Sequence, residues 1–316
     1  MNLLIIGNGF DLAHGLKTNY TDFLQWTYDS CEMEPFPYID SRGKQKCFDL
    51  PEYWRTLDNE KDRIEYQKIC NEDDNFPPKF VDDLFKRVDT WIDLENNFAQ
   101  IIEDNLAIWQ RNKPDSLFVE IFERFLVSKL EKYIAEVIDS VEIVQKFQIE
   151  GVDRVLSFNY SNTFERIYNK KAEICYINGK AAADAKQPSI VFWCDCYDYN
   201  QMELTRFNKL AQRAKIGTSG KYRQWLSEMD STRYKISVVG HSLGKTDWHI
   251  IHPFITSKNS ETTIYYHSEK SKQELIHRTI GMVGDKFMIQ HGVHFSNILD
   301  LKIDYSPVVT VINLQR

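Results

Sequence analysis

Short runs of apolar residues recur along the chain, and most are followed by a polar turn and then a helical pattern. The runs predicted as strands cover residues 2–6, 153–158, 173–177, 189–193, 235–239, 262–267, 286–289 and 308–314. Several are β-branched and apolar at successive positions, which is typical of strands covered on both faces. This alternation predicts an α/β fold with a Rossmann-like, mostly parallel sheet.

The stretch between the first strand unit and residue 150 has a different pattern. Residues 31–78 are polar, aromatic and irregular, and residues 80–102 and 117–138 carry apolar side chains at helix spacing on either side of Pro114. We therefore predict a single domain, residues 1–316, in which a core of residues 1–25 and 150–316 carries a helical insertion at 26–149. A smaller helical insert is expected at 201–231.

Composition and charge narrow the class of protein. The 316 residues include 42% hydrophobic and 27% charged residues, as in globular proteins, and the formal net charge is −7. This acidic balance argues against general nucleic-acid binding. No apolar stretch approaches the length of a membrane span, so we expect a cytoplasmic protein without a membrane partner. The six cysteines are expected to be free thiols, and their spacing predicts no metal site.

The turn after the first strand reads Gly7-Asn8-Gly9 and leads into a helical stretch. Glycines let a backbone approach a pyrophosphate closely, and the amides at a helix start favour an anion. However, Leu12 stands where the G-x-G-x-x-G dinucleotide pattern has its third glycine, and Asp11 suits a ribose hydroxyl better than a phosphate. Taken alone, the motif fits a ligand-binding turn and a plain turn equally well.

A second turn follows the predicted strand 153–158. Asn159 lies at the rim where parallel sheets bind ligands, and its carboxamide could bond a ribose or hold a water. A turn residue that bonds its own backbone is an equal alternative. Asn162 and Glu165 have capping-box spacing, so a helix is expected to start there.

The third turn, residues 240–244, reads Gly-His-Ser-Leu-Gly after a strand and matches the G-x-S-x-G nucleophile elbow. This pattern favours a serine hydrolase with Ser242 as nucleophile and His291 or His294 as base. Against it, the next helix is expected only at Asp247, whereas an elbow turns into its helix at once. No glycine-rich oxyanion loop precedes it, so the hydrolase is the second hypothesis.

Together, these turns resemble the AbiH family, bacterial proteins of abortive infection against phage. The segments that carry the resemblance are GNGFDLAHGLKTNYTDFL, WIDLENNF, SFNYSNTFERIY and VVGHSLGKTDW. More distantly, the family is similar to sirtuin-like NAD-binding domains of bacterial defence, which have a Rossmann-like fold and in several cases hydrolyse NAD. The resemblance implies that NAD, or a related ADP-ribose nucleotide, is the ligand or the substrate of an NAD glycohydrolase, without a metal.

The resemblance also implies a set of nucleotide-binding residues. By position, they are Gly7, Asn8, Gly9, Phe10, Asp11, His14, Asn159, Gly240 and Ser242. The amides near Gly9 are expected to hold the pyrophosphate, and Asp11 or Ser242 a ribose hydroxyl. Asn159 is expected to contact the nicotinamide-side ribose or the attacking water.

One position departs from the sirtuin-like pattern. Where that pattern has His-Gly, this chain has Asn178-Gly179, and an amide cannot act as a general base. The candidate catalytic residues are therefore Asn159, Asn178 and His241, with His14 as a further substitute base, although both histidines also suit a structural role. A third hypothesis is a defence module that senses a nucleotide without turnover. Its partners would be the nucleotide and either a second copy of the chain or another defence protein.

Overall fold

The computed structural model describes most of the predicted core and part of the predicted insertion. The described residues are 1–30, 36–39, 45–48, 94–95, 97, 100, 126–143, 146–149, 151–168, 171–182, 189–192, 208–218, 220–301 and 303–304. The chain divides into two compact units. The first comprises Met1–Thr18, Ile134–Val191 and Leu210–Arg316, and the second comprises Asn19–Tyr133 and Phe192–Lys209. The single domain with an insertion at 26–149 stays a prediction.

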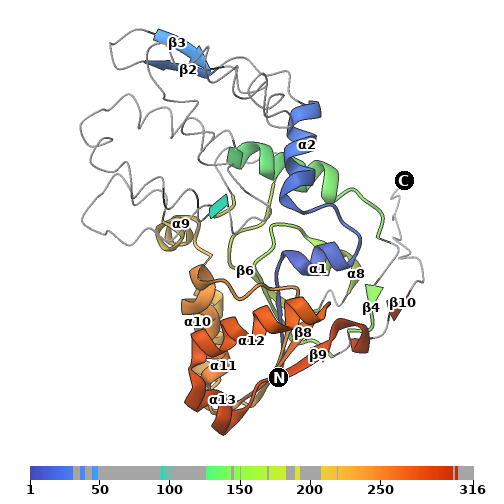
Figure 1. The fold of residues 1–316 in the computed structure, drawn as a ribbon, viewed down its shortest axis with the longest axis vertical. Coiled ribbons are helices and arrows are strands. Elements are labelled where there is room, and N and C mark those ends of the chain that lie inside the picture. The colour runs from blue at the N-terminus through green and yellow to red at the C-terminus, as the bar shows by residue number, and fades with distance from the viewer. Residues whose placement is uncertain are drawn as a thin grey trace. The chain divides into compact units, whose positions relative to one another are not determined.

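The first unit is built on a six-stranded sheet whose paired strands are all parallel (Figure 1). Its strands are β1 (Asn2–Ile6), β5 (Arg154–Ser157), β6 (Glu173–Tyr176), β7 (Tyr234–Val239), β8 (Ser260–Tyr266) and β9 (His294–Asn297). Across the sheet they lie in the order β6-β5-β1-β7-β8-β9. Numbered along the chain, this order is 3-2-1-4-5-6, the order of the Rossmann fold. The predicted α/β fold with a Rossmann-like sheet is confirmed.

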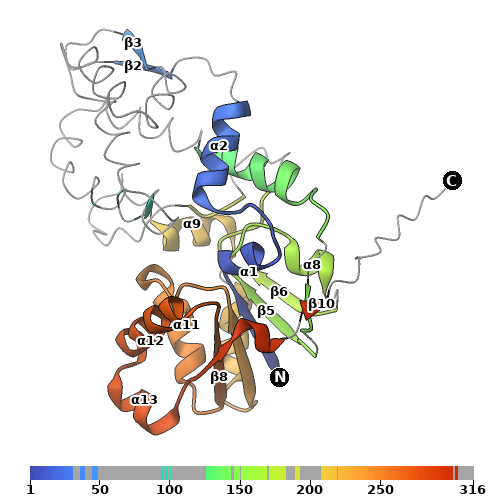
Figure 2. The same cartoon turned by 45° about the vertical axis from the view of Figure 1, so that its right-hand side comes forward.

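Successive residues of β1 enter two different cores. Leu3 and Ile5 pack in the core beneath the helices α10 (Gly220–Glu228), α11 (Trp248–Thr256) and α12 (Glu269–Val283). Leu4 and Ile6 pack in the core beneath α1 (Asn8–Ala13) and α8 (Thr163–Ile167). Because both faces of the central strand are covered, every position from Leu3 to Ile6 is apolar. The helices on the two faces can be followed in Figure 2.

Shorter elements complete the described structure. In or beside the first unit they are η1 (Tyr133–Ile138), α9 (Lys209–Ile216), η3 (Lys245–Asp247), α13 (Asp285–His291), η4 (Ile298–Leu301) and the antiparallel pair β4 (Lys146–Phe147) and β10 (Ile303–Asp304). The second unit contains α2 (Tyr20–Ser30) and an antiparallel pair of β2 (Phe36–Ile39) and β3 (Gln45–Phe48). That pair was not predicted. The helices α9 and α10 lie within the small helical insert expected at 201–231.

Two predicted strands are wrong. Residues 286–289 belong to the helix α13, in which Phe287 and His291 stack one helical turn apart at 4.7 Å. A four-residue apolar run does not distinguish a strand from a buried helix segment. Of the predicted strand 189–193, the described residues 189–192 contribute only an isolated bridge from Ile190 to Gly179. The edge strand β9 was missed, and the predicted strand 308–314 lies outside the described residues.

None of the helices in the described part of the chain is long and apolar enough to cross a membrane.

Candidate functional site

The three turns singled out from the sequence meet at one edge of the sheet. They follow β1, β5 and β7, which are adjacent and parallel, so all three leave the sheet at its carboxyl edge. The amide of Gly9 donates a 2.8 Å hydrogen bond to the carbonyl oxygen of Gly240. The rings of Phe158 and His241 pack with their centroids 4.4 Å apart. The strand order changes direction between β1 and β7, which is where Rossmann-like sheets bind ligands.

The glycines of the first and third turns allow their backbones to touch. A Cβ atom on Gly7 would lie 2.8 Å from the Cα of His241, and one on Gly240 would lie 2.0 Å from the amide nitrogen of Phe10. Gly240 also has a φ of +66°, which favours glycine. The amides of Gly9 and Phe10 donate to carbonyl oxygens of Gly240 and Gly7. These two amides, which were expected to help hold a pyrophosphate, are therefore already engaged within the protein.

Phe10 and His14 face the core beneath α1. Phe10 is fully buried, and its ring lies 4.4 Å from that of His14. His14 Nδ1 lies 2.6 Å from the carbonyl oxygen of Phe10, and Nε2 lies 2.6 Å from the hydroxyl of Tyr168. Burial lowers the pKa of His14 to about 4, so the imidazole is neutral, with Nδ1–H as donor and Nε2 as acceptor. This arrangement gives His14 a structural role in the core.

Asp11 is a buried carboxyl group at the carboxyl edge. It is 2% exposed, and its Oδ2 accepts a 2.5 Å hydrogen bond from the hydroxyl of Ser161, which in turn accepts one from Thr163. Burial raises the pKa of Asp11 to about 6, and hydrogen bonding from the side chains of Ser161, Thr163 and Asn159 offsets part of this rise. Asp139 has a pKa raised to about 6, also by burial, and repulsion from it adds a smaller rise at Asp11.

Two polar atoms beside this network are unsatisfied. Oδ1 of Asp11 and Nδ2 of Asn159 are buried and have no hydrogen bond of normal geometry within the described part of the chain, although the Asn159 side chain is close enough to Asp11 to lower its pKa. Asn159 is 5% exposed, and its backbone amide donates to the hydroxyl of Ser157. A buried polar group without a partner costs stability, so such an acceptor and donor side by side are typical of a site that takes a polar ligand.

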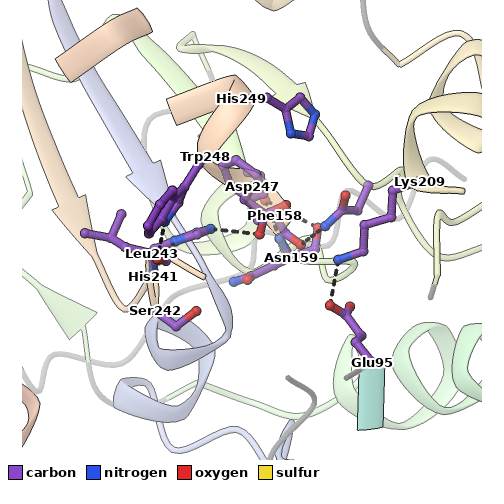
Figure 3. Close-up of polar contacts among 12 residues, drawn as sticks. Glu95, Phe158, Asn159, Lys209, His241, Ser242, Leu243, Asp247, Trp248 and His249 are labelled. Carbon is purple, nitrogen blue, oxygen red and sulfur yellow. Dashed lines mark hydrogen bonds and ion pairs between the residues drawn. The ribbon is translucent and has the colours of Figure 1, made fainter. Parts of the chain in front are cut away.

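The third turn is held in a strained conformation. Leu243 has a φ of 54°, and its amide donates a 2.9 Å hydrogen bond to Nδ1 of His241. Its carbonyl oxygen accepts a hydrogen bond from the indole of Trp248, and Nε2 of His241 lies 3.6 Å from Oδ2 of Asp247 (Figure 3). Both nitrogens of His241 thus face partners inside the turn. Ser242, by contrast, is half-buried, and its hydroxyl makes no hydrogen bond with any described residue.

Asn178 belongs to a buried network that sequence reasoning did not find. Its Nδ2 donates to the carbonyl oxygen of Phe158 at 3.2 Å, and its Oδ1 accepts from Arg213 at 2.8 Å. Arg213 is 1% exposed and also donates to Oδ1 of Asp247 and to Nε2 of His249, both at 3.1 Å. The network therefore links the second turn, the third turn and α9. Asp247 was read only as a helix start, and a lone arginine in a helical pattern gave no signal.

The geometry does not favour a serine hydrolase. In a nucleophile elbow the serine itself is strained, whereas here Leu243 carries the positive φ, and α11 starts only at Trp248. His294 pairs with Thr263, which pairs with Ser237, so His294 lies two strands from β7 and at the level of Ser237. Two strand spacings alone are roughly 9–10 Å, beyond hydrogen-bond reach of Ser242. His291 lies on α13, stacked on Phe287.

Glu95 lies in the segment WIDLENNF, which carries part of the family resemblance. In the second unit, its carboxylate forms a 2.8 Å ion pair with Lys209, whose side chain is buried. Glu95 is thus the partly buried partner of a buried lysine.

Two comparisons with known proteins bear on this chain. Residues 3–267 match a family model described as Bacteriophage abortive infection AbiH. The match covers well over half of the chain and includes all three turns. A search of the curated proteins finds no match.

Proposed function

The chain belongs to the AbiH family of bacteriophage abortive infection proteins, and from this premise we propose that it binds NAD, or a related nucleotide that contains ADP-ribose, at the carboxyl edge of its sheet. The proposal gives the three turns a shared ligand. The choice of nucleotide comes from the resemblance of these turns to sirtuin-like defence domains.

The observation that carries the proposal is the pair of unsatisfied atoms beside the Ser161 hydroxyl. Oδ1 of Asp11 accepts hydrogen bonds, and Nδ2 of Asn159 donates them. A ribose hydroxyl both donates and accepts, so a ribose placed here satisfies both atoms at once. Asp11 lies on α1, directly after β1, and Asn159 follows β5, next to the point where the strand order reverses.

Ser242 offers a second polar contact for the same ligand. Its hydroxyl is half-buried at the carboxyl edge, and the backbone of its turn is fixed by His241 and Trp248. A hydroxyl held on a rigid turn binds a sugar with little loss of conformational entropy.

The proposal is one of binding, without cleavage of the nicotinamide–ribose bond. The amide of Asn178 cannot take up a proton in the working range, and Arg213 occupies its oxygen. The nitrogens of His241 face the Leu243 amide and the Asp247 carboxylate. Both ring nitrogens of His14 and of His241 face protein groups.

Calorimetric titration with ADP-ribose and with NAD tests the proposal. Wild-type protein is expected to bind both, and Asn159→Leu to bind roughly tenfold or more weakly, because it loses a donor to the ligand. The matched control is Asn2→Leu, at the opposite edge of β1, where the amide donates to the carbonyl oxygen of Gly151. Wild-type protein that produces no heat with either nucleotide would refute the proposal. Release of nicotinamide from NAD would show that the protein cleaves the nucleotide and does not only bind it.

A further inference from the structure

Two amides of the first turn are not open to an anion at the carboxyl edge. The amides of Gly9 and Phe10 donate to carbonyl oxygens of the protein, and α1 is only six residues long. Yet any nucleotide that contains ADP-ribose carries a diphosphate. If the proposed function holds, a positive group at this edge would favour binding of the diphosphate.

Arg278 is placed to be that group. It lies on α12, is half-buried, and its NH1 donates a 2.7 Å hydrogen bond to the carbonyl oxygen of Ser242. This bond anchors the guanidinium beside the residue whose hydroxyl has no described partner. It uses one of the five N–H donors of an arginine, and no carboxylate of a described residue lies within ion-pair distance.

We propose that Arg278 binds the diphosphate of the nucleotide, an inference that rests on the proposed function. The planar fork of a guanidinium matches phosphate oxygens and keeps its charge at any physiological pH. A half-buried position strengthens the attraction, because the charge is less screened there than in open solvent. Arg278 lies outside residues 3–267, which match the family model, so this contact belongs to the part of the chain beyond that match.

The charge of Arg278 must be distinguished from its structural role in the third turn. Arg278 also fixes the third turn through the Ser242 carbonyl, and loss of that bond alone could weaken binding. Arg278→Gln keeps an N–H donor for this carbonyl but removes the charge, whereas Arg278→Lys keeps the charge but removes the fork. Lys270→Ala is the matched control, since Lys270 is an exposed cation on the same helix.

The experiment is an ADP-ribose titration of all four proteins at low and at high salt. We expect Arg278→Gln to bind at least tenfold more weakly than wild type and to lose most of the salt dependence of Kd. Arg278→Lys should bind between the two, and Lys270→Ala like wild type. Wild-type affinity or an unchanged salt dependence in Arg278→Gln would overturn this inference and leave the proposed function standing. Wild-type protein that does not bind ADP-ribose would overturn both.

Discussion

The amide nitrogen of Gly9 donates a 2.8 Å hydrogen bond to the carbonyl oxygen of Gly240. This bond joins two turns that are far apart along the chain and that follow the two strands between which the sheet order reverses. In a Rossmann fold, a glycine-rich first turn usually serves the approach of a ligand. Here, the glycines of the first turn also allow the third turn to pack against it. The positions of the residues on these two turns therefore depend on each other.

Gly240→Ala is therefore expected to be strongly destabilising. The new Cβ would lie 2.0 Å from the amide nitrogen of Phe10, and the residue would keep a φ of +66°. We expect the free energy of unfolding to fall by about 3 kcal/mol or more. The control is Gly217→Ala, where φ is +80° and no atom lies within 4 Å, so only backbone strain of about 1 kcal/mol applies. Urea unfolding measures the free energy of unfolding of both variants. Equal losses would show that the close contact with Phe10 is not the reason that residue 240 is a glycine.

The fold could be predicted from the sequence because its central strands are buried on both faces. Residues 2–6 were predicted as a strand, and β1 has these bounds. Prediction failed for the last strand of the sheet. Residues 286–289 were predicted as a strand but belong to α13, and the edge strand β9 was missed. The strand β9 is at most half-buried along its length, so its sequence carries no continuous apolar run.

The candidate site was only partly predictable, for a different reason. Each turn at a strand end could be located, and Asp11, Asn159 and Ser242 do lie at the carboxyl edge. The role of Arg213 could not be inferred, because its partners Asn178 and Asp247 are brought to it only by the fold. The hydrophobic pattern of a sequence predicts which face of a helix or strand is apolar. It does not predict which side chains, distant in sequence, form hydrogen bonds in the folded protein.

Arg213→Met should expose how much the buried network contributes to stability. The substitution leaves the Asp247 carboxylate and the Asn178 oxygen without their described guanidinium donor. Removal of one partner of a buried ion pair costs about 3–5 kcal/mol of unfolding free energy. Lys215→Ala, an exposed cation on the same helix, should change it by less than about 0.5 kcal/mol. Denaturant unfolding measures both free energies. If Arg213→Met lost no more than the control, the network would not contribute to stability as expected.

Asn178→His restores the residue of the sirtuin-like pattern but is not expected to restore cleavage of NAD. An imidazole beside the Arg213 guanidinium cannot both donate to the Phe158 carbonyl and accept from Arg213 with the geometry of the amide. We expect a loss of about 1–3 kcal/mol in unfolding free energy and no nicotinamide release. Chromatographic detection of nicotinamide checks this, and its release by the variant would show that the surroundings still support the reaction.

His14 should make stability fall on acidification. Its pKa is lowered from 6.5 to about 4 in the folded protein, so the unfolded chain binds more protons between these values. The stabilisation is present above pH 6.5 and is lost as the pH falls toward 4, by up to about 3 kcal/mol. His14→Gln should lack this loss, while Tyr168→Phe keeps the imidazole and should retain it. Unfolding free energies between pH 4 and 7 distinguish the two variants. Parallel pH profiles for wild type and His14→Gln would show that the loss of stability does not come from His14.

Asp11 should have the opposite pH dependence to His14. Its pKa is raised from 3.8 to about 6, so the folded protein binds the extra proton, and stability falls as the pH rises from about 4 to 6. At pH 7 the ionised carboxyl group therefore costs stability, on the order of 1–3 kcal/mol. Asp11→Asn, which is neutral at every pH, should be more stable than wild type at pH 7, and this difference in unfolding free energy should shrink as the pH falls from 6 to 4.

The same substitution should weaken nucleotide binding, and the two effects together test whether Asp11 is functional. A residue that lowers stability at neutral pH and keeps an unsatisfied oxygen is expected at a binding site, where stability is often lower than it could be. Asp11→Asn should bind ADP-ribose roughly tenfold or more weakly at pH 7, because a neutral amide is a poorer acceptor than a carboxylate. Wild-type affinity should likewise fall below pH 6, as Asp11 becomes protonated. Asp230→Asn, an exposed carboxyl group, is the control for both measurements. If Asp11→Asn gained stability with unchanged affinity, the carboxyl group would have no part in recognising the ribose.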